Sequence, residues 1–216
     1  MNALVLLNGE RPGNSLLKEE AERSDLIVCA DGAFEYALDC GITPDVIIGD
    51  MDSCSGDAGK RIENKEIENI KFPCEKDETD ALLAIDYAVD KGAGNIVLLG
   101  ATGLRIDHTY ANLMLMYRTK DKGVNIISKD SSCDIMVAVE KETASITGRK
   151  GLTVSLLPFG GDVHIIKTEG LKWNVENRNM NMDFPYGISN VMTDNEALVE
   201  IGKGCLLIII NKTLYF

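Results

Sequence analysis

The chain has 216 residues, 45% of them hydrophobic and 26% charged, and its formal net charge is −12. This length is sufficient for one large domain or two small ones, each with its own hydrophobic core. The acidic charge excludes a general nucleic-acid binder, because no basic stripe is present to neutralise phosphates. No apolar run approaches about 18 residues, so we expect neither a membrane-spanning helix nor a membrane partner.

The first part of the chain alternates apolar strand-like runs with segments of helical spacing. Helical spacing is clearest at 80–89 and 108–117, and Thr79 is expected to cap the first of these helices, with Asp80 at its positive end. This alternation is typical of an open parallel sheet with helices on both faces, an α/β/α domain. The predicted strands are 3–7, 26–30, 46–48, 67–72, 95–99 and 124–127.

The pattern changes near residue 130, beyond which short strand-like runs dominate and no helix-length periodic segment occurs. Glycine- and proline-containing turn signals separate these runs, which predicts a smaller all-β domain, either a sandwich or a barrel. We place the boundary between an α/β catalytic domain at 1–128 and a β domain at 129–216. The predicted strands of the β domain are 135–139, 144–147, 153–157, 163–166, 197–201 and 206–210.

The cysteines and histidines give little support for a metal site built from sulfur or nitrogen. The six cysteines contain no C-x-x-C pair, and two histidines are too few for a histidine-based site. Disulfide frameworks of secreted proteins are denser and occur in smaller chains. We therefore expect reduced thiols and a cytoplasmic protein.

Three acidic clusters stand where predicted strands end or helices begin. They are 49–53, which contains Asp50 and Asp52, then 77–80, and then 105–108. The carboxyl ends of neighbouring parallel strands converge on one crevice, so these clusters are expected to lie close together. Crowded carboxylates repel one another unless a cation joins them, and oxygen ligands suit Mg²⁺, which often arrives with phosphates. An Asp-x-Asp spacing alone is weak evidence, but its position after a strand favours a magnesium-dependent nucleotide enzyme.

Two further loops follow predicted strands and have two interpretations each. Gly32, after Asp31, permits a sharp turn or a close approach to a ligand. The alternative is an ordinary strand-to-helix turn with Asp31 as the cap. The small residues of 100–108 leave room for a phosphate or base that Arg105 could grip, the alternative being a loop with a solvated arginine. The chain contains no P-loop motif and no G-x-G-x-x-G fingerprint after a strand.

In the β domain, the only tryptophan, Trp173, stands between the polar residues Lys172 and Asn174. A single tryptophan in a β domain is often a core residue, whereas polar neighbours favour an exposed edge. Ser189 and Asn190 supply two hydrogen-bonding side chains further along the same domain.

Taken together, six segments resemble the thiamine pyrophosphokinase family. The family pattern is A-D-G-G-A-N, P-D-x-I-x-G-D-x-D-S, D-x-T-D, G-A-T-G-G-R-x-D-H, G-L-x-W and S-x-S-N. The chain's departures from this pattern include Ala33, Glu35, Leu104 and Gly187. The six segments that match these motifs, in the order in which the motifs are written above, are 30–35, 44–53, 77–80, 100–108, 170–173 and 187–190.

The resemblance implies a homodimer with active sites at the subunit interface and two small-molecule substrates, ATP and thiamine. Pyrophosphate would pass as a unit from ATP to the thiamine hydroxyl, giving thiamine diphosphate and AMP. It implies that Asp50, Asp52 and Asp80 hold Mg²⁺, and that Asp107 orients the hydroxyl or accepts its proton. The residues implied to bind ATP are Asp31, Gly32, Asp77, Thr79, Thr102, Arg105 and His108.

For thiamine, the resemblance implies that Trp173 stacks on the ring system, while Ser189 and Asn190 hydrogen-bond the aminopyrimidine. Two alternatives remain open. A different magnesium-dependent kinase would bind ATP but not thiamine. A non-catalytic sensor would bind its ligands without releasing AMP.

Overall fold

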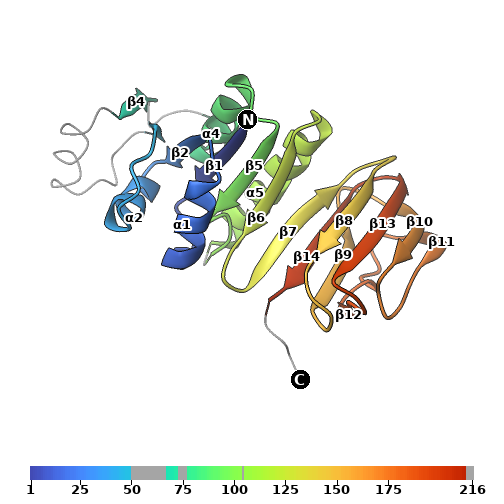
Figure 1. Cartoon of the computed structure of the whole chain (residues 1–216). Coiled ribbons are helices and arrows are strands. Elements are labelled where there is room, and N and C mark those ends of the chain that lie inside the picture. The colour runs from blue at the N-terminus through green and yellow to red at the C-terminus, as the bar shows by residue number, and fades with distance from the viewer. Residues whose placement is uncertain (50–66, 73–76, 104, 213–216) are drawn as a thin grey trace. The chain divides into compact units, whose positions relative to one another are not determined.

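The computed structural model describes residues 1–49, 67–72, 77–103 and 105–212, so Asp50, Asp52 and Leu104 lie outside the described residues. The chain divides into two compact units, Met1–Ser131 and Ser132–Phe216 (Figure 1). The first unit is mixed α/β and the second is built from strands. This agrees with the predicted fold class.

The strands of the first unit form a parallel sheet in the order β6-β5-β1-β2-β3-β4. Because β2 and β5 flank β1 on opposite sides, the direction of winding reverses between β1 and β5. Such a switch point leaves a crevice at the carboxyl ends of the two strands. The strands are β1 (Asn2–Leu6), β2 (Leu26–Ala30), β3 (Val46–Gly49), β4 (Glu68–Lys71), β5 (Asn95–Leu99) and β6 (Asn125–Lys129).

Both faces of β1, in the middle of this sheet, are buried. Leu4 and Leu6 of β1 share one cluster with Leu17 and Phe34, which belong to the first two helices. Side chains alternate along a strand, so the equally buried Val5 points to the opposite face. The helix α4 lies against β1, β2 and β3, and α5 lies against β6. The helices are α1 (Asn14–Glu22), α2 (Ala33–Asp39), α4 (Asp80–Asp90) and α5 (Ile106–Asp121).

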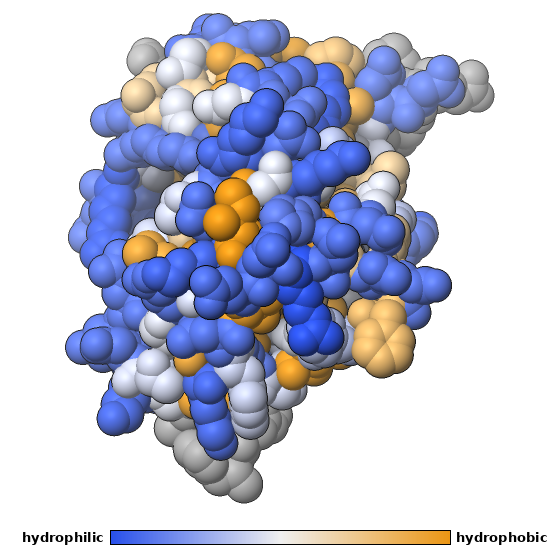
Figure 2. All heavy atoms as spheres, turned by 90° about the vertical axis from the view of Figure 1, so that its right-hand side faces the viewer, coloured by the Kyte–Doolittle hydropathy of each residue, from blue (hydrophilic) through white to orange (hydrophobic). Residues whose placement is uncertain are grey.

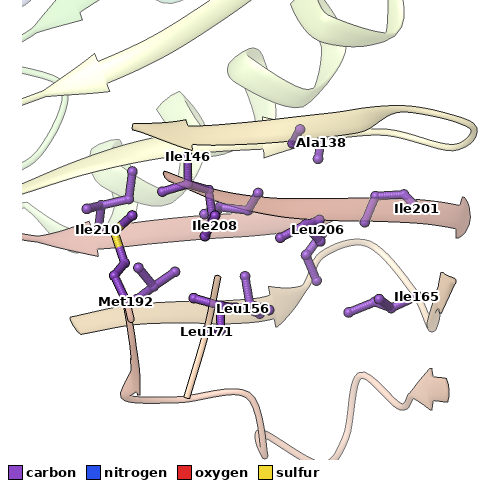
Figure 3. Close-up of a cluster of buried hydrophobic side chains, with 14 of the residues drawn as sticks. Ala138, Ile146, Leu156, Ile165, Leu171, Met192, Ile201, Leu206, Ile208 and Ile210 are labelled. Atoms are coloured by element: carbon purple, nitrogen blue, oxygen red, sulfur yellow. The ribbon is translucent and has the colours of Figure 1, made fainter. Parts of the chain in front are cut away.

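The second unit contains two antiparallel sheets, with strand orders β12-β9-β14-β7 and β11-β10-β13-β8. One buried cluster joins them, with Leu206, Ile208 and Ile210 from the first sheet and Ile165 and Ile201 from the second (Figure 3). The unit is therefore a β-sandwich. Its strands are β7 (Cys133–Ala138), β8 (Thr143–Thr147), β9 (Thr153–Pro158), β10 (Val163–Glu169), β11 (Glu176–Met180), β12 (Asn190–Val191), β13 (Glu196–Lys203) and β14 (Leu206–Asn211).

Every predicted strand is present, with bounds that differ by a few residues at most. Two strands were not predicted, β11 and β12. β11 is an exposed edge strand of polar residues that pairs with β10, so it has no apolar alternation to detect. β12 has only two residues.

The surface seen in one view is mostly polar. On the face drawn in Figure 2, hydrophilic side chains predominate and hydrophobic residues occur in small separate groups. Among the described helices, none combines the length and the apolar character needed to cross a bilayer.

Candidate functional site

A cleft of about 1270 Å³ lies in the first unit, at the carboxyl ends of β1, β2 and β5 and the N-terminal ends of α4 and α5. This is the switch point of the sheet, where open α/β sheets bind ligands. The residues that line the cleft are Leu7, Asn8, Gly9, Glu10, Ala30, Asp31, Thr79, Asp80, Ala81, Gly100, Ala101, Thr102, Gly103, Arg105, Asp107, His108, Thr109, Ala111 and Asn112.

The β1 and β5 backbones stay paired beyond the ends of the strands. The N–H groups of Leu7, Gly9 and Glu10 donate to the carbonyls of Leu99, Gly100 and Thr102, at 2.8, 3.0 and 2.7 Å. A Cβ on Gly9 would lie 2.2 Å from the Thr102 oxygen, and one on Gly100, whose φ is +71°, would lie 2.2 Å from the Leu7 oxygen. The two glycines are therefore required by the close approach of the two segments.

Three buried side chains, those of Asn112, Asp130 and Tyr36, form hydrogen bonds with residues that line this part of the cleft. The Asn112 side-chain amide donates to the Ala101 carbonyl at 2.7 Å, and the Thr102 hydroxyl donates to Asp130 at 2.9 Å. The Tyr36 hydroxyl donates to the Leu7 carbonyl at 3.0 Å, and burial raises the pKa of this phenol well above its usual range. Sequence reasoning missed all three supports. Asn112 offered a signal, because it is a polar residue one helical turn before the apolar Met116.

Acidic side chains from separate elements line the cleft: Glu10, Asp31, Asp80 and Asp107. Asp31 has a φ of +45°, in the left-handed region that residues other than glycine seldom adopt. Its N–H donates to the Ile48 carbonyl at 2.8 Å, which fixes this conformation. Such a held, unusual backbone at a cleft is the kind of position that functional sites use.

The Thr79 cap prediction is confirmed. The Thr79 hydroxyl accepts the Leu82 N–H at 3.2 Å, and Asp80 is the first residue of α4. Asp77 precedes the helix and does not line the cleft. Gly32 does not line it either. It occupies the N-cap position of α2, which has no side-chain cap, so Asp31 does not serve as that cap.

Arg105 and Asp107 form an ion pair at the start of α5. The guanidinium donates to the two carboxylate oxygens at 2.5 and 3.2 Å, and both side chains are largely exposed. These hydrogen bonds hold the pKa of Asp107 below its usual range and raise the pKa of Arg105. His108 lies beside them and lines the same cleft.

The metal prediction rests partly on residues outside the described ranges. Within residues 1–49, 67–72, 77–103 and 105–212, no group of three acidic, histidine or cysteine side chains is arranged to hold a metal ion. Asp50 and Asp52 lie outside these ranges, and Asp80 lines the cleft. The magnesium site therefore stays a prediction. The described cysteines, Cys29, Cys40, Cys133 and Cys205, are in the thiol form and not in disulfides.

In the second unit, Trp173 is 56% exposed, so it is not a core residue. The Lys172 ammonium lies 4.6 Å from the centroid of its ring. Asn190 is buried and hydrogen-bonds the backbone of Trp173. Ser189 has a φ of +61°, and its N–H donates to the Ser155 hydroxyl at 3.1 Å.

The described departures from the family pattern are compatible with the local packing. Ala33 is fully buried in α2, and the Glu35 N–H donates to the Gly32 carbonyl in the first turn. Gly187 accepts the Leu156 N–H at 2.8 Å, and a Cβ on Gly187 would lie 2.0 Å from the Leu156 oxygen. The backbone path of this chain therefore requires glycine at position 187.

A doubly wound sheet with a cleft at its switch point, followed by a β-sandwich, defines a two-domain protein of the ligand-binding α/β class. Comparison with known families narrows the class. Residues 17–128 match the family "Thiamin pyrophosphokinase, catalytic domain", and residues 136–206 match "Thiamin pyrophosphokinase, vitamin B1 binding domain". The chain belongs to the thiamine pyrophosphokinase family.

Individual relatives agree over most of the chain. A thiamine pyrophosphokinase of Bacillus subtilis is 30% identical over 172 residues, which is 80% of each chain. Thiamine pyrophosphokinase 1 of Arabidopsis thaliana is 28% identical over 98% of this chain and 87% of its own. The solved structure of thiamin pyrophosphokinase from Geobacillus thermodenitrificans has a TM-score of 0.86, with 26% identity over 99% of this chain and 98% of its own.

Arg105→Gln should raise the pKa of Asp107, because the substitution removes the guanidinium that stabilises the carboxylate. The carboxyl resonance of Asp107, followed by NMR across an acid titration, measures this shift. Asp86 is the matched control. Burial alone would raise its pKa, but hydrogen bonds from Arg118 outweigh burial and hold it low. An unchanged pKa of Asp107 in the variant would show that the pair does not exist in solution.

Proposed function

We propose that this chain transfers the pyrophosphoryl group of ATP to the hydroxyl of thiamine, giving thiamine diphosphate and AMP, with ATP bound in the cleft of the first unit. Family membership over both units is the observation that carries this proposal. The position of the cleft supports it, because switch-point crevices commonly receive nucleotides.

The proposed pyrophosphoryl transfer requires no covalent intermediate with the protein. The thiamine hydroxyl attacks the β-phosphorus, the bond from that phosphorus to the oxygen it shares with the α-phosphate breaks, and the hydroxyl proton is lost. Catalysis of such a transfer depends mainly on alignment and on neutralising charge. Arg105 and the N–H groups at the start of α5 are suited to phosphate oxygens. Asp107, at the same helix end, would orient the hydroxyl or accept its proton.

We propose Mg²⁺ as the cofactor, held by Asp50, Asp52 and Asp80. The donor chemistry of the cleft fits this ion, because carboxylates line it from four separate segments and oxygen ligands are those that Mg²⁺ prefers. When bound, the ion would supply positive charge to the phosphates. Asp31, Thr79, Thr102 and His108 belong to the proposed ATP site together with Arg105.

We propose Trp173 as the stacking platform for thiamine. Its indole is exposed, and a lysine ammonium already lies over the ring, so the exposed face accepts a cation. A cationic ring system on an indole gains roughly 0.5–2 kcal/mol. Ser189 directly precedes Asn190, whose side chain hydrogen-bonds the Trp173 backbone, and would contribute hydrogen bonds to the ligand.

We further propose a cytoplasmic homodimer without nucleic-acid or membrane partners. The exposed face of α5 supports a dimer, because Ile106, Tyr110, Met114 and Tyr117 recur at helical spacing and are 80, 53, 52 and 38% exposed. Light scattering on the purified chain tests this, since a dimer has twice the 23.6 kDa mass of one chain. The net charge of −12 supports the absence of a nucleic-acid partner.

AMP release from ATP and Mg²⁺, measured with and without thiamine, tests the proposed reaction. Thiamine-dependent AMP with thiamine diphosphate detected by mass would establish it. ADP as the product would mean transfer of a single phosphoryl group by a different kinase. Thiamine and ATP binding without AMP release would support a sensor instead.

Asp80→Asn should lower turnover by about 100-fold or more, because the variant loses a metal-binding carboxylate. The same loss is expected for Asp52→Asn. Asp90→Asn is the matched control, since Asp90 is the last residue of the same helix and lies outside the cleft. Initial rates at saturating ATP and thiamine give the comparison. Near-normal turnover of Asp80→Asn would contradict the metal assignment.

Trp173→Ala should raise the KM for thiamine much more than the KM for ATP, because only the thiamine ring stacks on the indole. Phe184→Ala removes another aromatic ring from the second unit, one that is 66% exposed, and should change neither constant. Steady-state kinetics with each substrate varied in turn measure both effects. Equal increases for the two substrates would mean that Trp173 has only a structural role.

A further inference from the structure

The side chain of Asn190 hydrogen-bonds both polar backbone groups of Trp173, the proposed stacking platform for thiamine. Its side-chain oxygen accepts the Trp173 N–H at 3.1 Å, and its side-chain nitrogen donates to the Trp173 carbonyl at 2.7 Å. The same oxygen accepts the Val191 N–H at 2.8 Å. An amide presents a donor and an acceptor side by side, so it can bond both polar groups of one residue.

The contrast in burial between the two residues indicates their roles. Asn190 is 8% exposed, whereas Trp173 is 56% exposed. The amide therefore lies inside the unit and the indole on its surface. A buried amide committed to three backbone bonds is suited to hold the tryptophan backbone in one place.

The segment before Trp173 and the segment after Asn190 are both anchored in the core of the sandwich. Leu171, two residues before Trp173, and Met192, two residues after Asn190, are 2% and 1% exposed, and their backbones form a β-bridge. Both side chains belong to the buried cluster of Figure 3. Between them, the Lys172 N–H donates to the Val191 carbonyl at 2.8 Å. The backbone pairing of the two segments thus begins in the core at Leu171 and Met192, and the Asn190 side chain continues it to Trp173.

The residues on either side of Trp173 in the chain are also held in place. Gly170 has a φ of +75°, and a Cβ there would lie 2.3 Å from the Glu196 carbonyl oxygen. Asn174, on the other side of Trp173, accepts the Leu171 N–H at 3.3 Å. The loop that carries Trp173 is therefore closed on itself, and Asn190 joins it to β12.

We infer that Asn190 is a positioning residue, which orients the exposed indole of Trp173 for thiamine by fixing the tryptophan backbone. This rests on the proposed function, and it assigns Asn190 a role different from the direct contact with the aminopyrimidine that the family resemblance implies. A platform held in advance does not have to be ordered when the ligand binds, which strengthens binding.

The test uses Trp173 itself as the reporter, because it is the only tryptophan of the chain. The variants are Asn190→Ala, which removes all three bonds, and Asn190→Asp, which keeps the acceptor but sets a carboxylate oxygen against the Trp173 carbonyl. Asn195→Ala is the matched control, since Asn195 accepts a backbone N–H from Lys150 elsewhere in the same unit. Fluorescence anisotropy of Trp173 and steady-state kinetics are measured on each full-length variant.

Both Asn190 variants should lower the anisotropy of Trp173 and raise the KM for thiamine by on the order of 10-fold. The KM for ATP and kcat should stay within about twofold of the parent values, whereas general unfolding would lower kcat. Asn195→Ala should leave all of these quantities unchanged. If Asn190→Ala does not fold, the nearly isosteric Asn190→Asp gives the answer.

Unchanged anisotropy in a folded Asn190 variant would overturn the inference, whatever the substrate of the enzyme. Lower anisotropy with an unchanged KM for thiamine would overturn it as well, because the held indole would then have no role in binding. The proposed function fails separately, through the absence of thiamine-dependent AMP release by the parent chain.

Discussion

Backbone hydrogen bonds between the segments that follow β1 and β5 are the constraint on which the cleft depends. They continue the pairing of the two strands past the switch point of the sheet, where two loops would otherwise separate. The close approach excludes a side chain at Gly9 and Gly100. Asn112 and Tyr36 then donate hydrogen bonds to carbonyls of the same two segments, so the backbone of this part of the cleft is held in place. A ligand therefore meets a surface that is already formed.

Much of the fold was predictable because buried strands and helices have recognisable patterns of apolar residues in the sequence. Parallel strands covered on both faces give continuous apolar runs, and β2 and β5 were predicted with the bounds that the structure has. The edge strand β11 could not be found in this way, since four of its five residues are exposed and polar. Its conformation comes from pairing with β10, a contact between distant parts of the chain that no local pattern records.

The candidate site was predictable where a residue follows a strand or begins a helix. Their positions pointed to Asp80 and Arg105, whereas Asp31 was assigned to the site by the family resemblance, and all three line the cleft. The supports behind them were missed because each acts through a single hydrogen bond to a residue 11 to 29 positions away. Asn190 was found by resemblance, but its bonds to the Trp173 backbone are visible only in three dimensions.

The ion pair of Arg105 and Asp107 has a consequence for which anions can use the cleft. A ligand that takes the two Arg105 donors engaged by Asp107 must replace a carboxylate that already carries one negative charge. A chloride or a single carboxylate brings no more charge than it displaces, so the exchange gains little. A triphosphate brings several charges and more acceptor oxygens, and the exchange favours it. At these two donors, the pair would therefore favour anions of higher charge.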